Sequence, residues 1–133
     1  MDRIVTIQKR DAEQFVHRYL DMWELPPTDN IDLTYDVTWI GLRDDSLRAV
    51  VGLVDSGEMG TYVHMLMHDG SAKGLRAMIE LTKYVFDAVD RLWWLVITEN
   101  HRMIRFFTRL GAQIVGPMHG ELMMRYSRFE VVV

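Results

Sequence analysis

The spacing of hydrophobic residues changes several times along this chain, and each spacing predicts a different element. Residues 3–7 have the apolar, β-branched character of a short strand. In residues 11–24 apolar side chains recur every three or four positions, which is the period of an amphipathic helix. Asp11 lies in the expected N-cap region. Pro26 and Pro27 follow this pattern and end it, because proline cannot continue the hydrogen-bond ladder of a helix.

The middle of the chain predicts a β-hairpin, a further strand and a long helix. The apolar runs 37–42 and 47–54 flank a short charged turn, and residues 61–67 form a third apolar run. Residues 68–74 are small, polar and glycine-containing, which indicates a loop. Helical spacing then resumes over residues 75–89, so we expect about four turns of helix there.

The last third predicts a strand, a shorter helix and a closing hairpin. Residues 93–98 form the strand, and the helix spans residues 100–110. Gly111 is well placed to stop that helix, since glycine accepts the left-handed conformation of a C-cap. The hairpin joins residues 114–115 to residues 122–126.

The predicted order of elements is β-α-β-β-β-α-β-α-β-β, which indicates an α/β (α+β) fold in one domain over residues 1–133. A helix connects strands 61–67 and 93–98, so these two strands are expected to be parallel with a right-handed crossover. The other strands can pair antiparallel. We therefore expect a mixed, mostly antiparallel sheet of six or seven strands, flanked by helices.

Composition limits the classes of function. The chain has 133 residues, of which 49% are hydrophobic and 26% charged, as in a folded globule. A net charge of −4 argues against nucleic-acid binding, and the absence of cysteine excludes disulfides and thiolate nucleophiles. The longest apolar run, near residues 92–97, is far shorter than the roughly 20 residues that cross a bilayer. The start lacks the apolar core of a signal peptide, so a cytoplasmic location without membrane contact is expected.

Two features together resemble the GNAT family of N-acetyltransferases. One is the element order, with a glycine-bearing loop after the fourth strand. The other is the stretch ITENHRMIRFFTRLGAQIVG, in which Asn100 opens a helix that ends in Leu110 and Gly111. The resemblance covers most of the chain and is strongest over residues 61–116. The sequence is also similar to short GNAT-like proteins that bacteriophages encode.

The resemblance implies that acetyl-CoA is the co-substrate. Its pantetheine would pair with backbone groups of the fourth strand, and its pyrophosphate would lie on amides at the start of the following helix, where the helix dipole favours anions. The residues that would contact it are Leu66, Met67, Ser71, Ala72, Lys73, Gly74, Leu75, Arg76, Asn100 and Phe107.

The chain departs from the family pattern at two places. In the phosphate signature only the central glycine, Gly74, is kept, and Arg76 replaces a small residue. Two interpretations stay open: Lys73 and Arg76 contact phosphate through their charge, or they are solvated residues of a plain turn. Phe107 stands where many members have a tyrosine that protonates the leaving thiolate.

A general base must accept a proton from the attacking amine, directly or through water. The candidates near the fourth strand are His64, Glu58 and Tyr62. His64 is favoured because imidazole titrates near neutral pH. Its alternative role is that of an ordinary residue in an apolar strand, and Glu58 is alternatively a simple loop carboxylate. No metal site is expected, although His64, His68 and Asp69 would be the candidates for one.

Two functions follow as hypotheses. The first is an acyl-CoA-dependent N-acyltransferase that transfers an acetyl group to a small-molecule or protein amine. The second is a catalytically impaired GNAT-like scaffold, encoded by a phage, that binds and modulates a host protein. A basic stripe at i, i+3 and i+7, formed by Arg102, Arg105 and Arg109, is either a solvated face or a docking site, for an acidic partner of the scaffold or for the 3′-phosphate of coenzyme A. The apolar residues 129–133 at the end of the sequence suggest a homodimer.

Overall fold

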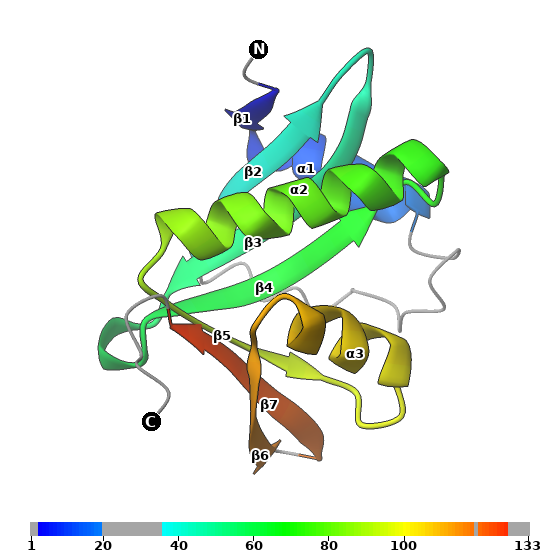
Figure 1. Cartoon of the computed structure of the whole chain (residues 1–133). Coiled ribbons are helices and arrows are strands. Elements are labelled where there is room, and N and C mark those ends of the chain that lie inside the picture. Colours follow the sequence, from blue (N-terminus) through cyan, green and yellow to red (C-terminus); the bar gives the residue numbers. More distant parts are fainter. Residues whose placement is uncertain (1–2, 20–35, 119, 128–133) are drawn as a thin grey trace. The chain divides into compact units, whose positions relative to one another are not determined.

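The computed structural model describes residues 3–19, 36–118 and 120–127 (Figure 1). Its sheet has seven strands in the order β1-β2-β3-β4-β5-β7-β6, which confirms the predicted mixed, mostly antiparallel α/β fold. The elements are β1 (Ile4–Thr6), α1 (Lys9–Tyr19), β2 (Thr38–Arg43), β3 (Leu47–Asp55), the short 3-10 helix η2 (Gly57–Met59), β4 (Thr61–His68), α2 (Ala72–Ala88), β5 (Arg91–Val96), α3 (His101–Arg109), β6 (Gln113–Met118) and β7 (Glu121–Ser127).

The chain divides into two compact units. The first unit contains Met1–Val54 and His64–Thr82, and the second contains Asp55–Val63 and Lys83–Val133. Strand β4 and helix α2 therefore each contribute residues to both units. The prediction of one domain over residues 1–133 stays a prediction.

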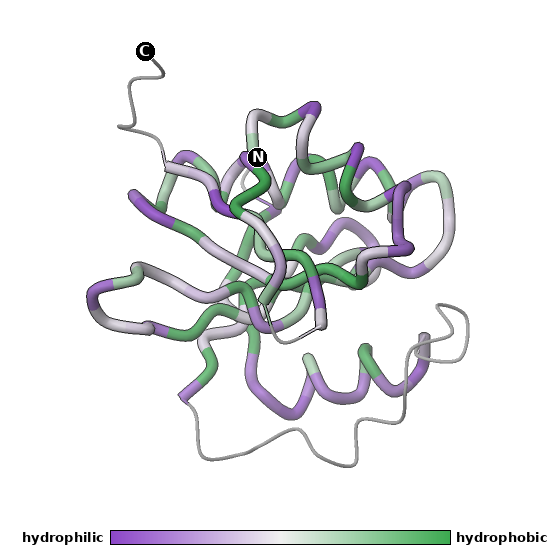
Figure 2. The backbone as a smooth tube through the Cα atoms, turned by 90° about the horizontal axis from the view of Figure 1, so that it is seen from below, coloured by the Kyte–Doolittle hydropathy of each residue, from purple (hydrophilic) through white to green (hydrophobic). Residues whose placement is uncertain are grey.

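In the first unit, α1 packs on the sheet through its apolar face. β2 pairs antiparallel with both β1 and β3. Phe15 and Val16 of α1 belong to one buried cluster with Trp39 and Met67. Figure 2 shows the alternation of hydrophobic and hydrophilic residues along the helices that such packing requires.

The start of α1 differs from the sequence prediction. The helix begins at Lys9, and the N–H of Ala12 donates to the carbonyl of Gln8 at 3.1 Å, so Asp11 lies in the first turn rather than at the N-cap. A carboxylate there still interacts favourably with the positive end of the helix dipole. The predicted end of this helix, with Pro26 and Pro27, lies outside the described residues.

In the second unit, β5 pairs with a neighbouring strand on each side. It pairs parallel with the start of β4, through Thr61↔Leu92 and Tyr62↔Trp93, which confirms the predicted parallel pair. On its other side β5 pairs antiparallel with β7, and β7 pairs with β6. The closing hairpin of the prediction is thus present, with longer strands than the sequence indicated.

Helix α3 begins and ends as the sequence predicts. The side chain of Asn100 accepts a hydrogen bond from the N–H of Met103, so Asn100 is the N-cap. Gly111 has a φ of 102°, and its N–H donates to the carbonyl of Thr108, which ends the helix. In the described ranges, no helix is long and apolar enough to cross a membrane.

Candidate functional site

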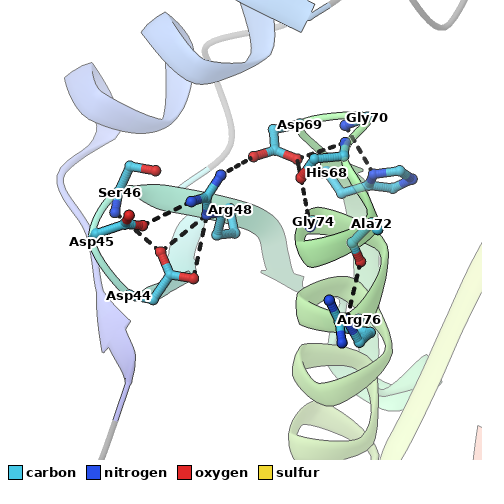
Figure 3. Close-up of polar contacts among 11 residues, drawn as sticks. Asp44, Asp45, Ser46, Arg48, His68, Asp69, Gly70, Ala72, Gly74 and Arg76 are labelled. Carbon is cyan, nitrogen blue, oxygen red and sulfur yellow. Dashed lines mark hydrogen bonds and ion pairs between the residues drawn. The ribbon is translucent and has the colours of Figure 1, made fainter.

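The predicted phosphate loop lies in the first unit, between the end of β4 and the start of α2 (Figure 3). Helix α2 begins at Ala72, three residues before the start that the apolar spacing indicated, so Lys73 and Gly74 lie in its first turn. The cause is a side-chain cap. The hydroxyl oxygen of Ser71 accepts a hydrogen bond from the N–H of Gly74 at 2.9 Å.

A second side chain, Asp69, stabilises the same turn. Its Oδ1 accepts hydrogen bonds from both the backbone N–H, at 2.9 Å, and the hydroxyl of Ser71. A Cβ atom at Gly74 would collide with this Oδ1. Gly74, the central glycine of the predicted phosphate signature, therefore makes room here for a carboxylate of the chain itself.

Arg48 of β3 holds the other oxygen of that carboxylate. Its Nη1 donates to Oδ2 of Asp69 at 3.1 Å, while its Nε and Nη2 donate to Asp44 and Asp45 at 3.0 and 2.7 Å. The side chains of Arg48 and Asp69 are only 17% and 7% exposed. In Figure 3 this arginine links the β2–β3 turn to the start of α2.

These contacts keep Asp69 ionised. Burial alone would raise the pKa of Asp69, but the hydrogen bonds from Ser71 and Arg48 outweigh burial and hold this pKa below its ordinary value. In turn, the carboxylates, with Asp69 first, raise the pKa of Arg48. A negative charge therefore lies at the N-terminus of α2 at neutral pH.

His68 precedes this network and is also buried. Its Nδ1 accepts a hydrogen bond from the N–H of Gly70 at 3.0 Å, and burial lowers its pKa despite the nearby charge of Asp69. Within the residues that the structure describes, no three His, Asp or Glu side chains converge as metal ligands do.

Strand β4 carries the favoured general base. Every residue of Thr61–Leu66 is half-buried, whereas Met67 is only 3% exposed. The imidazole of His64 lies edge-on to the indole of Trp39, with 6.2 Å between the ring centroids. Burial lowers the pKa of His64, so its side chain is neutral at pH 7 and able to accept a proton.

The other two base candidates lie in the second unit. Glu58 is exposed in η2. The ring of Tyr62 lies 4.5 Å from that of Trp93, and burial, with a smaller contribution from Glu121, raises the pKa of Tyr62. Its phenol therefore keeps its proton at neutral pH.

Phe107 and the arginine stripe also belong to the second unit. Phe107 is 5% exposed, and its ring lies 4.7 Å from that of Trp94, so it is part of the hydrophobic core. Its assignment to the co-substrate site, like that of Asn100, stays a prediction. The stripe residues Arg102, Arg105 and Arg109 are all exposed, and none has an ion-pair partner in the described part of the chain.

No protein-family model matches the sequence, and no curated protein matches it significantly. Solved structures do match. A GNAT-family acetyltransferase of Bacillus cereus ATCC 10987 is 13% identical, covers 98% of this chain and 99% of its own, and has a TM-score of 0.73. The aminoglycoside 6'-N-acetyltransferase of Enterococcus faecium is 13% identical, with coverages of 98% and 99% and a TM-score of 0.70. The ribosomal-protein-S18-alanine N-acetyltransferase of Escherichia coli is 15% identical, with coverages of 99% and 97% and a TM-score of 0.67.

The chain therefore has the fold of the GNAT acyl-CoA N-acyltransferases, as the sequence predicted. The resemblance to phage-encoded proteins stays a prediction.

The start of α2 offers only some of its backbone N–H groups to an anion such as a pyrophosphate. Among the described residues, the N–H groups of Ala72 and Lys73 have no acceptor and could bind an anion. Those of Ser71 and Gly74 already donate to side-chain oxygens. An incoming pyrophosphate would also meet the ionised carboxylate of Asp69.

The roles of Asp69 and Arg48 in stabilising the start of α2 were not predicted from the sequence. The signal that was present is the sequence Asp-Gly-Ser immediately before a helix, since aspartate and serine are the residues that cap helix starts. No sequence pattern pointed to Arg48.

Proposed function

We propose that this chain is an acyl-CoA-dependent N-acyltransferase that transfers an acetyl group to an amine. The observation that carries the proposal is the likeness to N-acetyltransferase structures over nearly the whole length of both chains. The names of these neighbours include an aminoglycoside and a ribosomal protein as acceptors, so the fold serves both small-molecule and protein amines. The acceptor of this chain is proposed only as an amine.

His64 supplies the chemistry that the acceptor needs. An amine must lose a proton when its nitrogen forms a new bond, and a neutral imidazole can accept that proton at pH 7. Tyr62, whose pKa is raised, is a proton donor rather than a base under the same conditions. Glu58 is the alternative base from the exposed end of the second unit.

The test is calorimetric titration with acetyl-CoA, followed by mass spectrometry of a panel of amines. We expect saturable binding of acetyl-CoA and a mass gain of one acetyl group on a subset of the amines. His64→Gln should keep the binding and lower the transfer rate by roughly a hundredfold or more, the usual share of a general base. Lys73→Glu should weaken the binding instead, because this exposed residue adds charge beside the free amides of α2.

The variant Gly74→Asp would place a negative charge on the loop, but its effect on binding would be ambiguous. Its Cβ would collide with Asp69, so loss of binding could reflect a distorted helix start. The proposed function is rejected if acetyl-CoA fails to bind at several hundred micromolar to the wild-type protein and to both of the Asp69 variants described below.

A second candidate function, a protein-binding scaffold without catalysis, is favoured by the arginine stripe of α3. Three exposed guanidinium groups without ion partners in the described residues would suit an acidic protein surface. The experiment is a pull-down from the source cells with wild type, Arg102→Glu/Arg105→Glu and, as the control, Arg43→Glu. A protein lost only from the double variant supports the scaffold, and one retained by all three argues against this face.

A further inference from the structure

The N-terminus of α2 already holds an anion, and that anion is part of the chain. Helix starts attract negative charge because their first N–H groups are unpaired and the helix dipole is positive there. Here Oδ1 of Asp69 accepts hydrogen bonds from the N–H and the hydroxyl of Ser71. The hydroxyl oxygen of Ser71 in turn accepts a hydrogen bond from the N–H of Gly74. The groups that would otherwise receive a phosphate oxygen are thus partly taken.

Arg48 holds the carboxylate of Asp69 in this position through its second oxygen. Arg48 donates to Oδ2 of Asp69, and the arginine is itself held by Asp44 and Asp45 on the β2–β3 turn (Figure 3). The backbone contributes as well, since the N–H of Asp69 donates to the carbonyl of Arg48 at 3.0 Å. Moving Asp69 away from α2 would break several charge-assisted hydrogen bonds at once.

We infer that Asp69 is a specificity-determining residue that competes with the pyrophosphate of CoA for the start of α2. An acyl donor that carries a pyrophosphate must either displace the carboxylate of Asp69 or bind next to it, at a cost in affinity from the repulsion between the two negative charges. The inference rests on the proposed function, because it concerns the co-substrate of the same site. It differs from the expectation drawn from the family resemblance, in which the pyrophosphate lies on the amides at the start of this helix.

The experiment compares calorimetric titrations of CoA and of inorganic pyrophosphate into wild type, Asp69→Asn and Asp69→Ser. Asparagine removes the charge and keeps an oxygen that can accept from Ser71, so the helix cap survives. Serine also vacates the space beside Gly74. The matched control is Asp45→Asn, which removes a carboxylate from the same arginine without touching α2, since Asp45 is 74% exposed on the turn.

We expect both Asp69 variants to bind CoA roughly tenfold or more tightly than wild type, because one close like charge is gone. Inorganic pyrophosphate should gain by a similar factor, and Asp45→Asn should stay within about twofold of wild type. Thermal melts followed by circular dichroism establish that every variant is folded. If Asp69→Asn loses its fold, Asp69→Ser provides the same comparison.

The outcomes separate this inference from the proposed function. Equal, saturable CoA binding by wild type and both Asp69 variants would overturn the competition and leave the acyltransferase in place. An equal gain in Asp45→Asn would also overturn it, since the effect would then be general charge. Tighter CoA binding by the Asp69 variants, with no amine acetylated, would support the competition and reject the enzyme. No CoA binding by any of the variants would reject both.

Discussion

The end of β4 in the first unit and the face of β5 in the second unit are stabilised by opposite kinds of contact. At the end of β4, Arg48, Asp69 and Ser71 form a chain of charge-assisted hydrogen bonds. On β5, Trp94 packs against two phenylalanine rings, with centroids 5.8 Å from Phe86 and 4.7 Å from Phe107. One region depends on particular donors and acceptors, and the other depends on shape and area.

This difference determines how each region responds to substitution. In the aromatic region the contacts of Phe107 and Trp94 depend on ring shape and area, so a substitution of similar volume is tolerated best. A polar network is less tolerant, since each donor needs its acceptor. The first turn of α2 therefore depends on Ser71 and Asp69 together.

The largest expected effect is on the aromatic side. Trp94→Ala should lower the free energy of unfolding by about 3–5 kcal/mol, because it removes the ring that packs against Phe86 and Phe107. Trp94→Phe is the matched control. Within the described residues the buried Nε1 of Trp94 has no hydrogen-bond partner, so losing it forfeits no bond and the cost should be less than half as large. Urea denaturation measures both, and equal losses would show that the indole N–H is bonded.

Arg48→Met removes the guanidinium group that holds the carboxylate of Asp69 at the end of β4. We expect the melting temperature to fall by roughly 5–10 °C, since a carboxylate only 7% exposed loses its counter-charge. The control is Arg43→Met, an exposed arginine near the same turn without an ion pair in the described residues, which should change little. Scanning calorimetry that gave the two variants the same melting temperature would contradict the role assigned to Arg48.

The two regions were also unequally predictable from the sequence. Apolar spacing found the body of α2 and strand β5, because packing residues repeat with the period of their element. It placed the start of α2 at residue 75 rather than at Ala72, because the first turn is set by Ser71 and Asp69 and not by apolar residues. The contact from Arg48 to Asp69 joins residues 21 apart in the chain, and a single sequence carries no signal of such a pairing.

The second unit also contains a polar contact next to its aromatic side chains. The indole N–H of Trp93 donates to the hydroxyl of Ser56 at 2.8 Å. Trp93→Phe should cost about 0.5–1.5 kcal/mol in the free energy of unfolding, the usual value of one hydrogen bond. In a double-mutant cycle with Ser56→Ala, the loss in the double variant should be smaller than the sum of the two single losses, and the cost that remains for Ser56→Ala is that of the bond from its hydroxyl to the carbonyl of Gly60. Fully additive losses in urea denaturation would mean that the two side chains do not interact in solution.

The smallest expected effect is on how the melting temperature changes with pH, rather than on its value at neutral pH. Because the folded state holds the pKa of Asp69 below its unfolded value of about 3.9, the ionised side chain stabilises the fold above that pH. This contribution is lost as the pH falls through the folded pKa, so the melting temperature of wild type should drop on acidification. Asp69→Asn should drop less steeply below about pH 4, since its amide does not titrate there. Parallel curves for wild type and Asp69→Asn would show that the network at the start of α2 contributes no more to acid sensitivity than an ordinary surface carboxylate.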